Sequence, residues 1–167
     1  TASADDCIST HAGANCCRRN MRNCCGTEAL TPTLYHSGLS GDVLAVMRFF
    51  TDLHHLQSVA LIGYSMGGNL VLKLAGELGK NPPSELRSVV GISPVIDLAP
   101  SSDALHLPQN RIYEMKFVRA MVRRFRRKAA LFPRAYDPNR VAGISSLRDF
   151  DEQIIALYAG FSGAEDY

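Results

Sequence analysis

The chain has 167 residues, of which 46% are hydrophobic and 20% charged, and its formal net charge is +2 at pH 7. This composition is ordinary for a globular domain with one hydrophobic core, and the small net charge gives no whole-chain attraction to a polyanion. No apolar stretch approaches the roughly 20 residues that span a bilayer, and the first residues lack the basic-then-apolar layout of a secretion signal. We therefore expect one domain, or part of one, without an anchor or an export signal.

All the cysteines lie within the first 25 residues. They are Cys7, Cys16, Cys17, Cys24 and Cys25. An odd count without an export signal favours reduced thiols over a disulfide framework, and hence a cytoplasmic location. The two Cys-Cys pairs match no familiar zinc-ligand spacing. The sequence therefore predicts no metal site, and it gives no reason to expect a cofactor.

The first predicted elements are a poor strand and an amphipathic helix. Residues 16–21 could form a strand, although their two arginines disfavour it. Residues 39–53 carry apolar side chains at helical spacing. Ser40 is the candidate N-terminal cap of this helix, and Asp42 falls in its first turn.

A strand, a tight turn and a buried helix follow in direct succession. The apolar run 59–62, with no room for a helix before Gly63, predicts a strand at 58–64 that is covered on both faces. The segment after the turn is apolar around most of its girth, with Lys73 and Glu77 on the polar side. Gly79 is a typical helix stop.

The remainder predicts one more strand and then helices. After a loop at 79–85, the apolar run 89–92 suits a second buried strand. The order helix, strand, helix, strand indicates parallel βαβ units. Two helices are predicted next, at 111–132, with an apolar face that starts at Ile112, and at 146–158. No strand is evident after residue 95, so the sequence predicts an α/β core followed by a helical region.

The turn between the first strand and the second helix carries the candidate active site. Its sequence, "GYSMG" at 63–67, matches the G-x-S-x-G pattern of the strand-to-helix turn called the nucleophile elbow. Such a turn holds the central Ser65 in a strained conformation, where Cβ atoms at Gly63 and Gly67 would collide with neighbouring backbone. The N–H group of Met66 is the expected donor to an oxyanion. The alternative is a glycine-rich turn that only packs a helix onto a strand.

Four segments together point to a family. They are "RNCCGTEALTPTLYHSG" at 22–38, "GYSMGGNLVLKLAGE" at 63–77, "ISPVIDL" at 92–98 and "NRIYEMKF" at 110–117. In these segments the chain resembles the YheT-type branch of the α/β-hydrolases, a family of esterases. The resemblance implies a partial α/β-hydrolase fold, with the core and its nucleophile elbow at 1–98 and a helical lid at 99–167. It also implies a serine hydrolase of acyl or lipid-like esters of short to medium chain length, with Ser65 as the nucleophile of a Ser-Asp-His triad.

The chain also departs from this family. Asn23 and Cys25 stand where the family usually has glycines. The family's His-Gly segment lies well upstream of that loop, and the "HAG" at 11–13 is too close to be its equivalent. The family's acid and histidine follow the lid, and this sequence stops about where a lid would end. We therefore expect a truncated member that lacks the C-terminal part of the core and shows little or no esterase activity.

Two histidines deserve comparison with the triad. His106 is the only histidine after Ser65, and Asp103 precedes it by three residues. A base and its supporting carboxylate from one short segment would hardly both reach their positions behind the serine, so we expect His106 to be a surface or lid-packing residue. His36 matches a recurrent family position, and we expect it to organise the loop near the site.

A basic cluster suggests a second activity. Residues 111–134 contain nine basic residues and one acidic residue, Glu114. Arg123, Arg124, Arg126, Arg127 and Lys128 could contact an anionic membrane weakly or could bind nucleic acid. A solvated helix face is the simpler explanation, and we expect no nucleic-acid partner. A further alternative for the whole chain is a non-catalytic binding module that keeps an acyl pocket without its chemistry.

Overall fold

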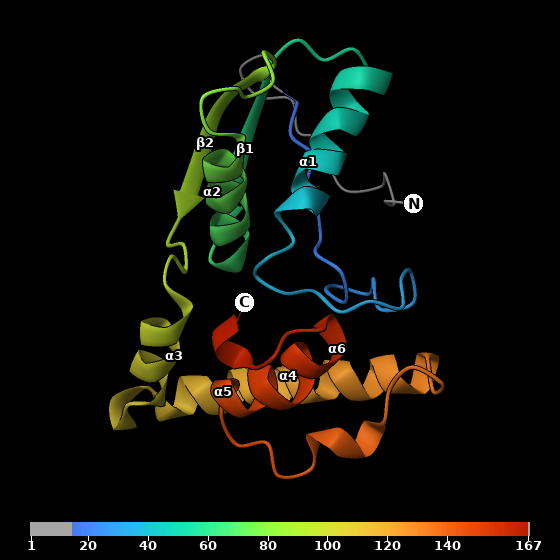
Figure 1. Cartoon of the computed structure of the whole chain (residues 1–167), viewed down its shortest axis with the longest axis vertical. Coiled ribbons are helices and arrows are strands. Elements are labelled where there is room, and N and C mark those ends of the chain that lie inside the picture. Colours follow the sequence, from blue (N-terminus) through green and yellow to red (C-terminus); the bar gives the residue numbers. More distant parts are fainter. Residues whose placement is uncertain (1–14, 167) are drawn as a thin grey trace.

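The computed structural model describes residues 15–166, which form an α/β part and a helical layer beside it (Figure 1). The elements of the α/β part are α1 (Ser40–Arg48), β1 (Val59–Tyr64), α2 (Met66–Leu78) and β2 (Leu86–Ile92). Those of the helical layer are α3 (Leu98–His106), α4 (Arg111–Leu131), α5 (Leu147–Phe150) and α6 (Leu157–Ala159). A π-helical segment, Phe49–Leu53, continues α1, and another, Asp151–Ala156, joins α5 to α6. Short 3-10 turns occupy Pro108–Asn110, Pro138–Val141 and Ala164–Asp166.

The two strands form a parallel sheet with α2 as the crossover helix. Ile62 lies opposite Val90, and Gly63 lies opposite Gly91. The predicted βαβ unit is therefore confirmed, although β2 begins at Leu86, three residues before its apolar run. No strand follows Ile92 within the described residues. The predicted stop of α2 is also confirmed, because Gly79 caps that helix with a φ of 57°.

Only one face of this sheet is covered by the residues that the structure describes. Leu61 and Val89 point toward α2 and pack against a buried cluster centred on Leu70 and Leu74. On the opposite face Ile62 is 59% exposed and Tyr64 is 68% exposed, and Val90 and Ile92 beside them are exposed as well. The prediction of strands covered on both faces is therefore wrong for this chain. Successive side chains of a strand point to opposite faces, and the described helices pack on one face only.

The predicted strand at 16–21 is also wrong, because the described residues before α1 form loops and turns. Arg19 donates to the Asp42 carboxylate at 3.1 Å, and Arg22 forms two hydrogen bonds of 2.6 Å with it. These bonds hold the loop against the first turn of α1, where Asp42 was expected. The arginines that made a strand unfavourable thus serve as anchors.

Ser40 is not the cap of α1, contrary to the sequence prediction. It is the first helical residue, and the N-cap position belongs to Leu39, which forms no side-chain cap. The buried Ser40 hydroxyl instead donates to the Glu77 carboxylate at 2.5 Å. Glu77 also pairs with Lys73 at 2.9 Å. The serine therefore links α1 to α2 rather than closing its own helix.

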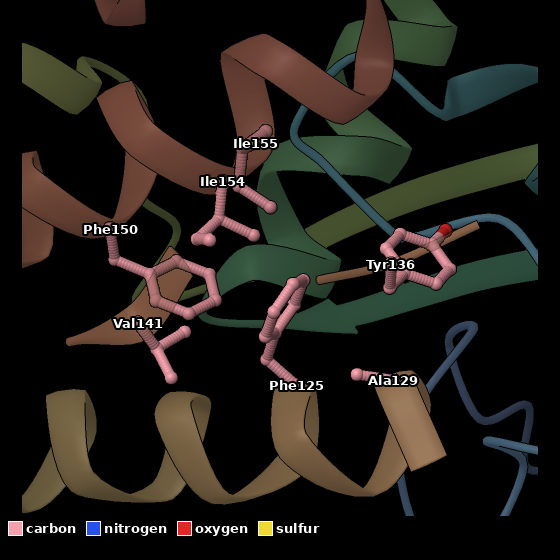
Figure 2. Close-up of a cluster of buried hydrophobic side chains, with 7 residues drawn as sticks. All are labelled: Phe125, Ala129, Tyr136, Val141, Phe150, Ile154 and Ile155. Carbon is pink, nitrogen blue, oxygen red and sulfur yellow. The ribbon is translucent and has the colours of Figure 1, made fainter. Parts of the chain in front are cut away.

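The helical layer has its own hydrophobic core. Figure 2 shows Phe125 and Ala129 of α4 directed toward the segment that carries Phe150, Ile154 and Ile155. The ring of Phe125 meets the rings of Tyr136 and Phe150 edge-on, at centroid distances of 5.7 and 6.5 Å. Such edge-to-face pairs add to the stabilisation from burial. The long helix predicted at 111–132 is confirmed. The helix predicted at 146–158 is present as a helical segment from α5 to α6 whose middle, Asp151–Ala156, is π-helical, and α3 was not predicted.

The predicted apolar face of α4 is correct for only part of the helix. Val118 and Phe125 are buried as expected. Ile112 was placed on the same face but is 64% exposed, because the buried face begins with Glu114 and the first turn extends past the core.

Lys128 ties the helical layer to the N-terminal loop. Its side chain is fully buried, and its ammonium donates to the carbonyl oxygens of Glu28, at 2.8 Å, and Thr31. It also lies 4.8 Å from the centre of the Phe132 ring. Burial lowers the pKa of this lysine, because removing an ammonium from water disfavours its charged form. Lys128 is therefore a structural anchor, and its predicted place on a membrane-facing surface is wrong.

We predict that Lys128→Met destabilises the chain by about 2–4 kcal/mol, because two loop carbonyls would lose their donor at a buried position. Chemical denaturation monitored by circular dichroism measures this free energy. Lys116→Met is the matched control, since Lys116 is exposed on the same helix. Equal stability of the two variants would contradict the anchoring role.

The Asp42 cluster predicts a pH dependence. Hydrogen bonds from Arg22 lower the pKa of Asp42 below its ordinary value. The folded state therefore favours the charged carboxylate, and its contribution is complete above the unfolded-state pKa, about 4. It is lost as the pH falls through the lower pKa of the folded state. We expect Asp42→Asn to cost about 1–2 kcal/mol at neutral pH, with the difference from wild type shrinking below about pH 4. The exposed Asp52→Asn is the control, and a pH-independent difference would refute the assignment.

Candidate active site

Ser65 occupies the turn that joins β1 to α2. Its backbone has φ 51° and ψ −120°, a conformation that residues with a side chain rarely adopt. The Ser65 N–H donates to the Ile92 carbonyl at 3.0 Å, and its own carbonyl accepts from Asn69 N–H at 3.1 Å. One hydrogen bond to β2 and one to α2 thus fix the strained backbone of Ser65, while its side chain remains exposed.

The glycines around Ser65 permit this turn, but not in the way that the sequence predicted. A Cβ atom at Gly63 would lie 2.1 Å from the Gly67 carbonyl oxygen, a distance that no real structure allows, so glycine is required there as expected. A Cβ atom added at Gly67 would meet nothing within 4 Å, apart from its own helix backbone, so the prediction of a collision at that position is wrong. The tight contact belongs to Gly68 instead, where a Cβ would lie 3.0 Å from the Pro94 side chain.

Met66 is the first residue of α2 and lies directly behind Ser65. The N–H groups in the first turn of a helix have no partner within that helix, and the helix dipole favours negative charge at this end. The backbone of Met66 is therefore available to a charged oxygen beside Ser65. Its role as the oxyanion donor stays a prediction.

Ser65 and Met66 line a cavity between the α/β part and the helical layer. The volume of the cavity is about 270 Å³, close to the lower end of ligand pockets. Apolar side chains form most of its wall: Leu34, Val95, Leu98, Leu105, Phe117, Met121, Phe125, Leu147, Phe150 and Ile155. A serine at the edge of an apolar cavity is the arrangement that an acyl group requires.

The polar groups on the cavity wall were not predicted from the sequence. Arg124 lines it and lies 3.4 Å from the Cys24 thiol, so its predicted place in a membrane contact is wrong. Burial raises the pKa of the Cys24 thiol and of the Tyr35 hydroxyl beside it. Asn23 is buried, and its side-chain oxygen has no hydrogen-bond partner among the described residues. The helical spacing of 117, 121, 124 and 128 was the signal that could have shown which residues of α4 face the site.

His36 lines the same cavity as Ser65. Its Nδ1 accepts a hydrogen bond from the Gly38 N–H at 3.1 Å, and its ring meets the Phe161 ring edge-on at 5.1 Å. Burial lowers the pKa of His36, so the ring is neutral at pH 7 and carries its proton on Nε2. Nε2 is then a donor, which fits a residue that shapes the loop rather than one that accepts a proton.

His106 lies elsewhere, on the outside of the helical layer. The ring is 72% exposed, and Nδ1 is 2.9 Å from the buried Glu114 carboxylate. Glu114 also accepts a hydrogen bond from the Leu147 N–H at 3.2 Å. Asp103, the carboxylate considered with His106, is 3.7 Å from Arg148. The structure therefore does not bring these two residues to Ser65.

The backbone of the loop before the site shows why glycine suits the two positions at which this chain departs from the family pattern. Asn23 has φ 62° and Cys25 has φ 55°, in the region that glycine adopts most easily. Asparagine tolerates this conformation better than other residues, and the Asn23 amide also donates to the Thr33 carbonyl at 3.3 Å. Cys25 is exposed and gains nothing comparable.

The described residues contain no grouping of three or more side chains that could hold a metal ion. The four cysteines among them are free, and Cys7 and the "HAG" at 11–13 lie outside the described residues. In the same part of the chain, no helix combines the length and the apolar character that crossing a bilayer requires.

Comparison with known proteins assigns the family. The family model described as "alpha/beta hydrolase fold" matches residues 3–154, and the chain belongs to this family. The chain is 26% identical to the putative esterase YheT of Escherichia coli over 152 residues, which are 89% of this chain and 44% of that protein. It is 27% identical to the mouse phospholipase ABHD3 over 164 residues, 96% of this chain and 39% of the relative. It is 21% identical to the monoacylglycerol lipase of Saccharomyces cerevisiae over 167 residues, which are 96% of this chain and 37% of that protein.

The chain thus spans less than half the length of these relatives. No solved structure matches it. The parallel βαβ unit with its flanking helices is consistent with part of an α/β-hydrolase fold.

We predict that Cys25→Gly stabilises the chain by about 0.5–1 kcal/mol, because the substitution relieves a left-handed backbone conformation at an exposed position. Cys17→Gly is the control, since Cys17 is also exposed but has no positive φ. This substitution should not increase the stability of the folded chain. Thermal unfolding of both variants measures the difference. A loss of stability on Cys25→Gly would contradict the strain at this position.

Proposed function

We propose that Ser65 is the nucleophile of a carboxylic ester hydrolase. The observation that carries this proposal is the strained and exposed serine at a strand-to-helix turn, on the edge of an apolar cavity. The family supports it, because α/β-hydrolases place their nucleophile at such a turn. The names of the relatives, which include an esterase, a phospholipase and a lipase, agree with an ester substrate.

The proposed chemistry is acyl transfer through Ser65. Its Oγ attacks the ester carbonyl carbon while its proton passes to a base, and the carbonyl oxygen becomes an oxyanion stabilised by the Met66 N–H and the start of α2. The tetrahedral intermediate then expels the alcohol, which takes up a proton, and leaves an acyl-serine. Water attacks this ester in the same way and releases the carboxylic acid.

The base is the missing partner among the described residues. His36 is the only histidine among the described residues that line the cavity, and its Nδ1 is already engaged by the Gly38 N–H. A serine without its base keeps only a small part of the activity of a complete triad. We therefore expect Ser65 to be a weak nucleophile in this chain, whereas a longer protein of this family would be an active esterase.

The proposed substrate is an acyl or lipid-like ester of short to medium chain length. The wall of the cavity is mainly aliphatic and aromatic, and its volume of about 270 Å³ suits a small acyl group. Helices α3 and α4, together with the segment from α5 to α6, form a layer beside the α/β part (Figure 1) and contribute wall residues to the cavity that Ser65 lines. We assign them the role of a lid, which excludes water from the reacting ester.

A non-catalytic binding module is the second candidate. The absence of a base from the described cavity wall favours it, because the cavity would still hold an acyl chain. An activated serine reacts with a fluorophosphonate, whereas an ordinary serine does not, and this difference separates the two functions.

We predict slow fluorophosphonate labelling of this chain that Ser65→Ala abolishes. Ser93→Ala is the matched control, because Ser93 is also exposed and has a positive φ of 45° but does not line the cavity. Hydrolysis of p-nitrophenyl butyrate should be roughly 10⁴-fold or more below that of an enzyme with a complete triad. Labelling that persists in Ser65→Ala would refute the nucleophile, and the absence of any labelling would favour the binding module. Rapid turnover lost on Ser65→Ala would refute the missing base.

A further inference from the structure

The outer face of α4 carries a line of positive charge, which we call the basic stripe. It consists of Lys116, Arg119, Arg123, Arg126 and Arg127, all of which are exposed. At 3.6 residues per turn these positions fall within about 100° of the helix circumference. The buried residues Val118, Phe125 and Ala129 lie on the other side and fix the stripe toward solvent. Only three of these five residues belong to the cluster expected from the sequence, because Arg124 and Lys128 turn inward.

The charge of the basic stripe is mostly uncompensated. Arg127 pairs with Glu28 at 3.1 Å. The other four side chains form no ion pair with any residue of the part that the structure describes. Four neighbouring cations without a counter-ion repel one another at low salt, and an anionic surface laid along the helix would remove this repulsion.

Exposed apolar side chains flank the stripe at the start of α4. Ile112 lies in line with it and is 64% exposed, and Leu107, just before the helix, is exposed as well. Phe117 is 52% exposed although it also lines the cavity, so the cavity reaches the surface beside this face. A basic face next to exposed apolar side chains is the pattern of helices that lie in a membrane interface.

We propose that the basic stripe, together with Ile112 and Leu107, binds the surface of an anionic phospholipid membrane. The arginines and Lys116 would face the headgroups, and the apolar side chains would enter the boundary of the acyl region. Nucleic acid is the less suitable partner, because its phosphates would satisfy the cations but leave the aliphatic Ile112 and Leu107 in water. The contact would place the exposed side of the cavity, at Phe117, close to the membrane.

Vesicle binding of the whole chain tests this proposal, whether or not Ser65 is a nucleophile. Phosphatidylcholine vesicles with and without phosphatidylserine are compared by co-sedimentation, using the variant Arg119→Gln/Arg123→Gln. The matched control, Lys80→Gln/Arg87→Gln, removes two exposed charges from the other part of the molecule. We expect binding to the anionic vesicles only, weakened about 30-fold in the stripe variant and unchanged in the control. Both variants replace exposed side chains, and circular dichroism verifies that they are folded.

Two further measurements use the unmodified stripe. Raising the salt concentration should weaken vesicle binding by the wild type. Ile112→Ser should also weaken it, because the apolar contact contributes to binding. The proposal fails if neither kind of vesicle binds, if both bind equally, or if the control variant loses as much affinity as the stripe variant. Tighter binding to a single-stranded RNA oligonucleotide than to anionic vesicles, with no effect of Ile112→Ser, would assign the stripe to nucleic acid instead.

Discussion

The close approach of two backbone segments at the end of β1 is the constraint on which the site depends. Gly63 passes so near to Gly67 that the carbonyl oxygen of Gly67 occupies the place of a Cβ atom. The chain can therefore leave the sheet and enter α2 within a single residue, and Ser65 takes up the strain of that reversal. Gly68 continues the contact by admitting Pro94, which brings the end of β2 beside the start of α2. One set of backbone contacts thus exposes the serine and places an unsatisfied helix end next to it.

The N-terminal loop holds the cavity together from the other side. Lys128 reaches it from α4, and the Tyr136 hydroxyl donates to the Pro32 carbonyl. The same loop is anchored to α1 through Arg22 and Asp42. The loop thus connects the helical layer to the α/β part over a sequence separation of about a hundred residues. The position of the cavity wall relative to Ser65 therefore depends on buried polar contacts as well as on hydrophobic packing.

The elements that follow from local pattern were predicted correctly. The strand, turn and helix around Ser65 could be identified because an apolar run, a glycine-serine-glycine turn and a helical apolar face follow each other within about twenty residues. The two long helices of the helical layer were predicted for the same reason. Gly63 was also correctly expected to need a position without a side chain, since the turn itself demands it.

The features that depend on distant parts of the chain could not be predicted in this way. An apolar strand has the same pattern whether or not a helix covers its second face, so the exposure of Ile62 was not visible. Lys128 and Arg124 look like members of a basic surface cluster, and only the packing of the N-terminal loop against α4 reveals that one anchors this loop and the other lines the cavity. Ser40 resembles a cap because the local rule cannot anticipate the carboxylate of Glu77 on another helix.

The two-stranded sheet has a consequence for how this chain behaves at high concentration. Within the described residues β1 and β2 pair only with each other, so the outer edge of each strand offers backbone hydrogen-bonding groups to an incoming strand. The side chains of Ile62, Tyr64, Val90 and Ile92 make the uncovered face beside these edges apolar. Natural sheets protect such edges with charges, prolines or bulges, whereas β1, "VALIGY", carries no charge and no proline. The sheet that presents the serine is thus also the surface through which copies of this chain would add strands to one another.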